Sequence, residues 1–359
     1  MRRSHPEQDL LLRVLISPTA MVELSEPEWD ALLPRARASR LLARLAAQEP
    51  MPDWTDRLPW RVRDQLTGAA VMAAHNERLV RWEVNRIERA LKHLALPILL
   101  LKGAAYLAAG LAAAKGRLVS DVDIMVPHET LEVAEAALRD AGWQPIKLDP
   151  YHQRYYRSWM HELPPLRHQE RGTVVDLHHT ILPPTSRLKP DPAKLWAAAR
   201  RLDRSPLHVL APADMVLHAA AHLFQDGDLR RALRDLVDIG DLLGHFGAEP
   251  GFWRHLVPRA AELGLGRPLF YALRYCRRLL RTPIPDDVMA EAPAPPRPVL
   301  LAMDRLVPRV LIPEDGQGVE ASAGPSLLLY MRAHWLRMPP WLLLPHLARQ
   351  AARRVAGDR

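Results

Sequence analysis

Two aspartates, Asp121 and Asp123, stand one residue apart in the apolar run "RLVSDVDIMV" at residues 117–126. Aspartate is disfavoured inside strands, and side chains two positions apart on a strand point to the same side. The two like charges therefore repel each other unless a cation screens them. Paired carboxylates of this kind hold hard divalent cations such as Mg²⁺, which commonly bridges them to substrate phosphates. A solvated strand end is the ordinary alternative for an isolated Asp-x-Asp.

A turn that could bind an anion precedes the acids. A buried strand is expected to end at Leu101, after which Lys102, Gly103 and Ala104 lead into an Ala-rich helix. Glycine lets a ligand approach the main chain closely, and the free N–H groups at the start of a helix attract phosphate. An ordinary tight turn between a strand and a helix would use the same residues.

A third acid, Asp176, lies in the apolar run "GTVVDLHHTI" at residues 172–181. This run predicts a second strand that could lie beside the first. Three carboxylates on neighbouring strands are what a two-metal site requires, where one cation activates an attacking hydroxyl and the other stabilises the leaving group. The alternative is an acid on an edge strand that pairs with a nearby arginine.

The order of these features resembles the nucleotidyltransferase superfamily typified by DNA polymerase beta. More narrowly, it resembles the bacterial group called uncharacterised nucleotidyltransferase family proteins, over roughly residues 70–245. In the superfamily a Gly-Ser or Gly-Gly turn opens a helix, an Asp-x-Asp follows, and a third acid lies on a later strand. The resemblance implies that the catalytic and metal-binding acids are Asp121, Asp123 and Asp176.

The resemblance also implies a nucleotide site beside the acids. The narrower group is expected to share a lysine before the glycine and an arginine before the acids. One position departs from the pattern, because Ala104 stands where the superfamily usually has Ser or Gly. The hydroxyl that would touch the triphosphate is absent, so Lys102 or Arg117 is expected to replace it. The expected nucleotide-binding residues are Lys102, Gly103, Ala104, Arg117 and Ser120.

Three histidines are candidates for the acceptor side of the site: His178, His218 and His222. The last two lie four residues apart on a predicted helix and share one face. Their spacing also fits zinc ligands, but no third ligand is evident in the sequence, so a packed or substrate-facing pair is favoured. On the next predicted helix, Asp235 or Asp238 is expected to form a structural salt bridge rather than to act in catalysis.

Composition limits the kinds of protein this can be. The 359 residues include 49 Lys and Arg against 41 Asp and Glu, a net charge of +8 that favours anionic partners. The single cysteine, Cys276, excludes an internal disulfide and a cysteine zinc site, and it is expected to be a buried, inert thiol. Neither a signal peptide nor an apolar run of the ~20 residues needed to span a membrane is evident, so a cytoplasmic protein is expected.

Hydrophobic periodicity predicts an α+β fold in which a small mixed β-sheet is flanked by N-terminal and C-terminal helical regions. Helical patterns occupy residues 27–48 and 69–95, short apolar runs alternate with helices in the middle, and helical patterns return from about residue 190. The expected divisions are an N-terminal helical region at 1–95, a nucleotidyltransferase core at 96–185 and a C-terminal helical domain at 186–359. The Trp-, Leu- and Arg-rich tail at 330–359 is expected to pack on protein, with membrane contact as the alternative.

These features together predict an enzyme that moves an NMP group from an NTP to a hydroxyl-bearing acceptor with release of pyrophosphate. Mg²⁺ is the expected ion and Mn²⁺ the alternative. ATP binding is expected, although the preferred NTP, the acceptor and the oligomeric state stay open. A small molecule, peptide or protein acceptor is favoured over nucleic acid. Two alternatives remain: a non-catalytic nucleotide-binding or maturation-partner protein on the same fold, and a metal-dependent glycosyltransferase.

Overall fold

The protein is mixed α+β, as the sequence pattern predicts, with one seven-stranded sheet and helices before and after it. The computed structural model describes residues 9–48, 54–146, 155–157, 159–203, 205–225, 229–230, 232–312, 323–339, 341 and 343. Across these residues, the buried apolar side chains form one continuous core that runs from the N-terminal helices through the sheet into the C-terminal helices.

The sheet is mixed, and its strands lie in the order β3-β4-β5-β2-β1-β7-β6. Their bounds are Leu99–Leu100 (β1), Asp121–Met125 (β2), Trp143–Pro145 (β3), Leu166–His168 (β4), Val174–His178 (β5), Arg200–Arg201 (β6) and His208–Val209 (β7). Strands β2 and β5 are parallel neighbours at the centre, and β1 runs antiparallel to β2 on its other side. The two strands that carry the predicted acids are therefore adjacent.

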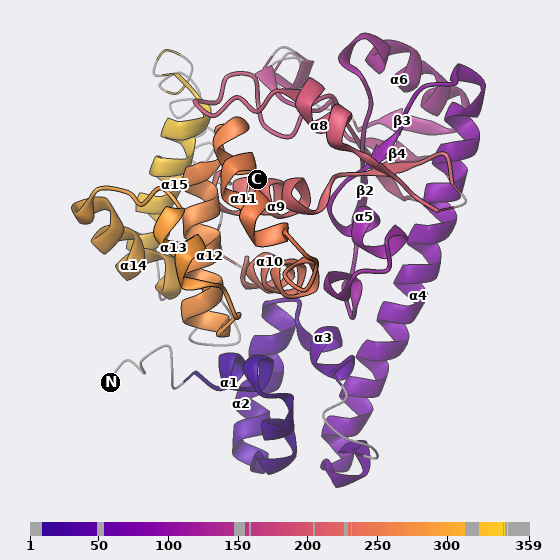
Figure 1. The fold of residues 1–359 in the computed structure, drawn as a ribbon. Helices are drawn as coiled ribbons and strands as arrows, with labels where there is room; N and C mark the ends of the chain where they lie inside the picture. Colours follow the sequence, from indigo (N-terminus) through magenta and orange to yellow (C-terminus); the bar gives the residue numbers. More distant parts are fainter. Residues whose placement is uncertain are drawn as a thin grey trace, which may run out of the picture.

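The N-terminal helices pack beside the sheet through one long helix. Their bounds are Leu10–Ile16 (α1), Glu26–Ala38 (α2), Leu42–Ala46 (α3) and Trp60–Leu91 (α4). Helix α4 runs along one side of the molecule from the N-terminal helices to the sheet (Figure 1). Its buried Glu83 accepts hydrogen bonds from Arg171 Nη2 at 2.9 Å and from Thr173 Oγ1 at 2.7 Å. These contacts attach α4 to the turn that leads into β5.

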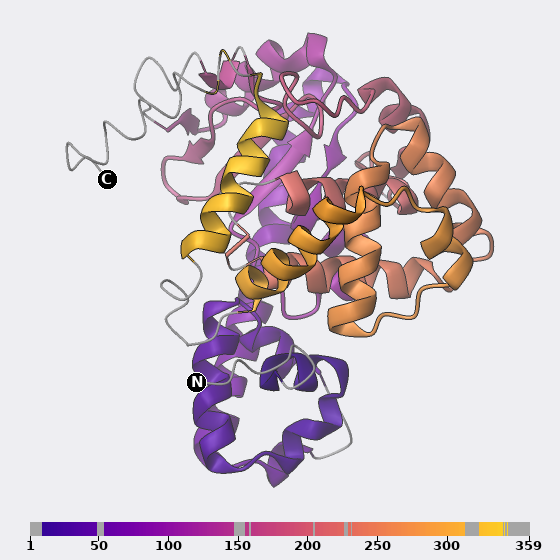
Figure 2. The same ribbon diagram turned by 90° about the vertical axis from the view of Figure 1, so that its left-hand side faces the viewer.

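Two helices complete the α/β part, and a helical group follows it. The bounds are Lys102–Ala108 (α5), Leu131–Asp140 (α6), Pro192–Ala198 (α8), Pro212–Gln225 (α9), Leu233–Phe246 (α10), Phe252–Glu262 (α11), Gly266–Leu280 (α12), Asp286–Glu291 (α13), Arg297–Leu311 (α14) and Ala323–Arg337 (α15). Helix α9 packs against α10, α11 and α12. The side view shows these helices beside the sheet and the N-terminal helices below both (Figure 2).

Helix α9 is fixed by a buried ion pair. Asp214 in its first turn is fully buried and accepts two hydrogen bonds from Arg259 of α11, both at 2.8 Å. A buried carboxylate is tolerated only when such partners satisfy it. Residues of α9 also line the candidate site described below. The pair of Asp214 and Arg259 therefore helps to position one side of that site.

Four further predictions concern the extent of the sheet, Cys276, membrane spans and the C-terminal tail. The sheet continues past residue 185, because β6 and β7 lie at residues 200–209; the three-part division itself stays a prediction. Cys276 is buried, as expected, and burial raises the pKa of its thiol. Within the described ranges, no helix combines the length and apolar character needed to cross a membrane. Of the predicted tail, residues 344–359 lie outside the described residues.

Candidate active site

The three predicted acids lie on one side of the paired strands β2 and β5. Asp123 of β2 stands directly opposite Asp176 of β5 in the parallel register, and Asp121 is two residues before Asp123. Side chains at these positions share a face of the sheet because strands alternate their sides with a period of two. The apolar residues between them, Val122 and Ile124, are buried on the opposite face. The alternation explains how an acidic row fits in a buried strand.

Asp123 is neutralised by two neighbours. Its Oδ1 lies 2.7 Å from Lys102 Nζ and 3.0 Å from His178 Nε2. Burial on its own would raise the pKa of Asp123, but Lys102 and His178 outweigh it and hold that pKa far below its usual range. Burial likewise opposes the charge on Lys102, yet the attraction of Asp123 raises its pKa above the ordinary value. In the structure, Asp123 is therefore a carboxylate and Lys102 an ammonium.

Asp176 is in the opposite situation. Burial, followed by the negative charges of Glu162, Asp123 and Asp121, raises the pKa of Asp176 to about 7. Its Oδ1 is buried and has no hydrogen-bond partner among the described residues. Buried polar atoms normally have a hydrogen-bond partner. A buried carboxylate oxygen that lacks one and lies beside other carboxylates is typical of a site that binds a cation. Asp121, Asp123 and Asp176 offer the carboxylate oxygens that a hard divalent ion prefers, although among the described residues these three are not a group whose donor atoms all lie within 4.8 Å of one another.

Glu162 is a further member of the site that the sequence reasoning missed. It forms an isolated antiparallel bridge with His178, and its Oε2 lies 3.3 Å from His178 Nε2. His161, beside it, completes a group of three possible ligand residues whose donor atoms lie within 4.8 Å of one another. Because His178 also contacts Asp123, this group adjoins the acidic row and is part of the same site.

The turn before α5 brings its main chain close to the loop that precedes β2. Lys102 has φ of +45°, an uncommon left-handed conformation for a residue with a side chain. A Cβ at Gly103 would lie 2.8 Å from Val119 Cγ2 and 2.9 Å from Arg117 Nε, so any larger residue would force these side chains to move. Ala104 is buried, so the position at which the superfamily usually has Ser or Gly faces the protein interior here.

Arg117 is held by acids rather than left free. It forms an ion pair with Asp238 of α10 and lies 4.0 Å from Asp235. Its guanidinium also lies over the ring of Tyr106, 5.6 Å from the centroid. Asp238 in turn accepts a hydrogen bond from buried Arg234 at 2.8 Å. These contacts fit the expectation that Asp238 forms a structural salt bridge, and they give Arg117 the role of joining the loop to α10.

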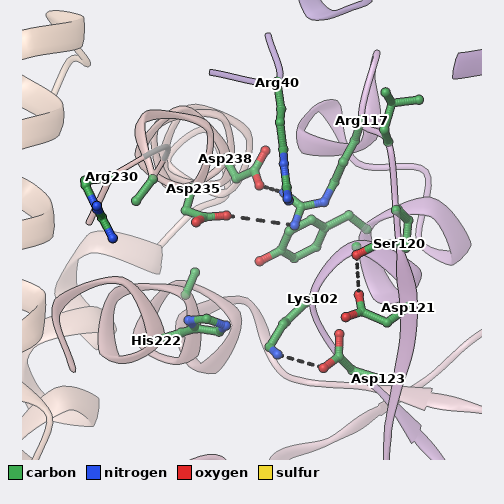
Figure 3. A pocket seen from close by; sticks show the side chains of 16 residues that line it. Arg40, Lys102, Arg117, Ser120, Asp121, Asp123, His222, Arg230, Asp235 and Asp238 are labelled. Carbon is green, nitrogen blue, oxygen red and sulfur yellow. Dashed lines mark hydrogen bonds and ion pairs between the residues drawn. The ribbon is translucent and has the colours of Figure 1, made fainter. Parts of the chain in front are cut away.

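A cavity of about 400 Å³ opens over Asp121 and Asp123 (Figure 3). Ser120 lies on its wall and donates a hydrogen bond from Oγ to Asp121 Oδ1 at 3.0 Å. The lining residues come from the N-terminal region, the α/β core and the C-terminal helices: Arg40, Lys102, Gly103, Tyr106, Arg117, Leu118, Val119, Ser120, Asp121, Asp123, Ala219, His222, Arg230, Ala232, Asp235 and Asp238. Ala104 and Asp176 are not among them. The cavity therefore has acids on one wall and several cationic side chains around it.

Comparison with known families agrees with this geometry. The sequence model of the family described as "Uncharacterised nucleotidyltransferase" matches residues 25–281. The chain belongs to this family. No curated protein matches the chain. The family match spans most of the N-terminal helices, the whole sheet and the helices up to α12, so it covers every residue that lines the cavity.

In this nucleotidyltransferase-family chain, the three predicted acceptor-side histidines occupy different environments. His178 is fully buried at the base of the acidic row. His218 is buried in α9, where burial and the neighbouring charge of Lys102 hold the pKa of its imidazole well below the usual range. His222, one turn further along, lines the cavity. Among the described residues, the one group of three possible ligands does not include His218 or His222.

Proposed function

We propose that the protein transfers a nucleotidyl group from an NTP to a hydroxyl-bearing acceptor and releases pyrophosphate. The observation that supports this most directly is the register that sets Asp123 beside Asp176, with Asp121 on the same face of β2. Membership of a nucleotidyltransferase family supports the same reaction class. The acceptor oxygen would attack the α-phosphorus, the bond to the bridging oxygen would break, and pyrophosphate would leave.

Asp121, Asp123 and Asp176 are the residues that would hold a divalent cation, with Mg²⁺ preferred and Mn²⁺ as the alternative. When bound, such an ion neutralises phosphate charge and makes an acceptor hydroxyl more acidic. Asp176 would complete the site next to the acceptor hydroxyl. Its pKa is raised to about 7 by burial and the neighbouring carboxylates, and a bound cation would lower it and favour the carboxylate. Lys102 is bonded to Asp123 in this structure and would neutralise charge on the phosphates once its ammonium group moves away from Asp123. Ser120 orients Asp121 through its hydrogen bond.

The walls of the cavity divide into a donor side and an acceptor side in this proposal. The turn at Lys102 and Gly103 belongs to the donor side, while His222 belongs to the acceptor side. The buried His178 and His218 do not line the cavity and would lie behind its acceptor side. A small molecule, peptide or protein is favoured as acceptor over nucleic acid. A cytoplasmic location is part of the same proposal.

A second candidate is a non-catalytic nucleotide-binding or maturation-partner protein. It is favoured by the internal pairing of Asp123 with Lys102 and His178, which satisfies one of the acids without any ligand, and by Ala104 in place of Ser or Gly. A metal-dependent glycosyltransferase has less support, because such an enzyme does not require the third acid that lies beside Asp123.

Transfer of a label from an NTP labelled at its α-phosphate would test the proposal. The wild-type protein is incubated with Mg²⁺, each of the four NTPs and pools of candidate acceptors, and labelled products and released pyrophosphate are measured. Asp121→Asn should abolish transfer, whereas the matched control Asp140→Asn, at an exposed acid in α6, should not. Binding of Mg-NTP without any transfer would favour the non-catalytic candidate, and no binding of any NTP would reject both.

A further inference from the structure

Arg40 belongs to the N-terminal helices, yet its side chain enters the cavity. It lies in the turn between α2 and α3 and extends toward the pair of Arg117 and Asp238 (Figure 3). Lys102 and Arg117, which also line the cavity, are already paired with carboxylates. For Arg40, no carboxylate lies within ion-pairing distance in the part of the chain that the structure describes. Its charge is therefore available to a ligand.

The main chain holds Arg40 in an unusual conformation. Its φ is +57°, in the left-handed region that residues with a side chain rarely adopt. Its carbonyl oxygen accepts a hydrogen bond from Nη1 of the buried Arg234 at 3.4 Å. The same guanidinium also donates to the carbonyl of Gly116 at 3.2 Å. One buried side chain thus ties the turn of Arg40 to the loop that leads into β2.

Two further contacts fix this turn on the core. Arg44 of α3 donates to the carbonyl of Ala112 at 3.1 Å and to Asp241 Oδ1 of α10 at 2.8 Å. Gly116 lies so close to α3 that a Cβ there would be 2.3 Å from the carbonyl oxygen of Ala43. The N-terminal helices are therefore joined tightly to the loop before the acids, and Arg40 is positioned by this docking rather than by chance.

We propose that Arg40 binds the terminal phosphates of the NTP, so that the N-terminal helical region completes the donor site. This rests on the proposed function. A cation held at Asp121 and Asp123 would attract the triphosphate to that wall, and the guanidinium of Arg40, which has no acidic partner among the described residues, lines the same cavity. Arginine forms paired hydrogen bonds to phosphate oxygens, so Arg40 would contribute to the binding of triphosphates and pyrophosphate but not of an NMP.

Equilibrium binding of Mg²⁺ complexes of an NTP and of pyrophosphate, and of the NMP, would test this proposal. Arg40→Gln should weaken NTP and pyrophosphate binding by about tenfold to a hundredfold, the loss expected for a charged hydrogen-bond donor. NMP affinity should stay unchanged. Arg37→Gln is the matched control, because Arg37 is exposed on the preceding turn and hydrogen-bonds Gln65. That variant should bind all three ligands as the wild type does.

Arg40→Gly separates loss of the side chain from loss of the fold. Glycine adopts a positive φ without strain, so this variant should melt no lower than the wild type and still lose NTP affinity. Wild-type NTP affinity in both Arg40 variants, or an equal loss for NMP and NTP, would overturn the role of Arg40 and leave the proposed function intact. If the wild-type protein binds no NTP, the proposed function and this inference both fail.

Discussion

Asp176→Asn should stabilise the protein without added metal, and the gain should grow with pH. Burial and three neighbouring carboxylates raise the pKa of Asp176 to about 7 from an ordinary 3.8. Between these two values the unfolded chain loses the proton and the folded chain keeps it, so folding becomes less favourable as pH rises. The contribution of protonated Asp176 to the free energy of unfolding is therefore complete below pH 3.8, and it is lost as the pH rises through about 7.

The size of this stabilisation follows from the difference of about three pH units between the pKa of Asp176 in the folded protein and its ordinary value. Each unit corresponds to about 1.4 kcal/mol, so ionised Asp176 costs the folded protein up to ~4 kcal/mol above pH 7. Asparagine keeps the size and polarity of the side chain and removes this cost. The advantage of the variant over the wild type should therefore increase by roughly 2–3 kcal/mol between pH 5 and pH 8.

Urea unfolding in EDTA at the two pH values measures this advantage, with Asp140→Asn as the control for the loss of an exposed acid. Added Mg²⁺ and NTP should then reverse the order, because a bound cation favours the ionised wild-type side chain. An advantage that is equal at pH 5 and pH 8 would show that the charge of Asp176 does not destabilise the folded protein. A variant less stable than the wild type at pH 8 would show instead that Asp176 has a structural partner.

The other predictions concern the Lys-Gly turn and the histidine helix. Lys102→Met should lower the free energy of unfolding by about 3–5 kcal/mol in urea, because it leaves Asp123 without its ammonium partner; a neutral effect would mean that His178 is a sufficient partner. Gly103→Ala should cost about 1–3 kcal/mol in the same assay, since the added Cβ would lie 2.8 Å from a methyl group, whereas Gly68→Ala in α4, where nothing lies within 4 Å, should stabilise. Metal analysis of the purified protein should find no stoichiometric zinc; one zinc per chain that is lost in His222→Ala would contradict this.

The strands that carry the acids could be predicted because their pattern is local. The alternation around Asp121 and Asp123 and around Asp176 is visible in short windows, and both β2 and β5 lie where the pattern indicates them. The outer strands of the sheet are two or three residues long, too short to show a period. Their pairing is set by tertiary packing, which no local pattern records.

The residues that the sequence did not reveal depend on contacts between distant segments. Residues 27–48 show a continuous helical period in the sequence. In the structure the helix is interrupted between α2 and α3, where Arg234 donates a hydrogen bond to the carbonyl of Arg40. Glu162 belongs to no motif and reaches the site through its bridge to His178. Arg117 stands close to the acids in sequence, which favoured a phosphate role, yet Asp238 of a later helix is its partner.

The charges around the acids are the reason we expect a cation at this site. Asp121, Asp123, Asp176 and Glu162 cluster on one side of the sheet, while Lys102 is the ammonium paired with Asp123. Without a further positive charge, the cheapest way to reduce the repulsion is to keep a proton on one carboxyl, and Asp176 is the one whose pKa rises to about 7. A divalent ion would remove the need for that proton. The proton on Asp176 and a bound cation would therefore be alternatives, and filling the site should release that proton.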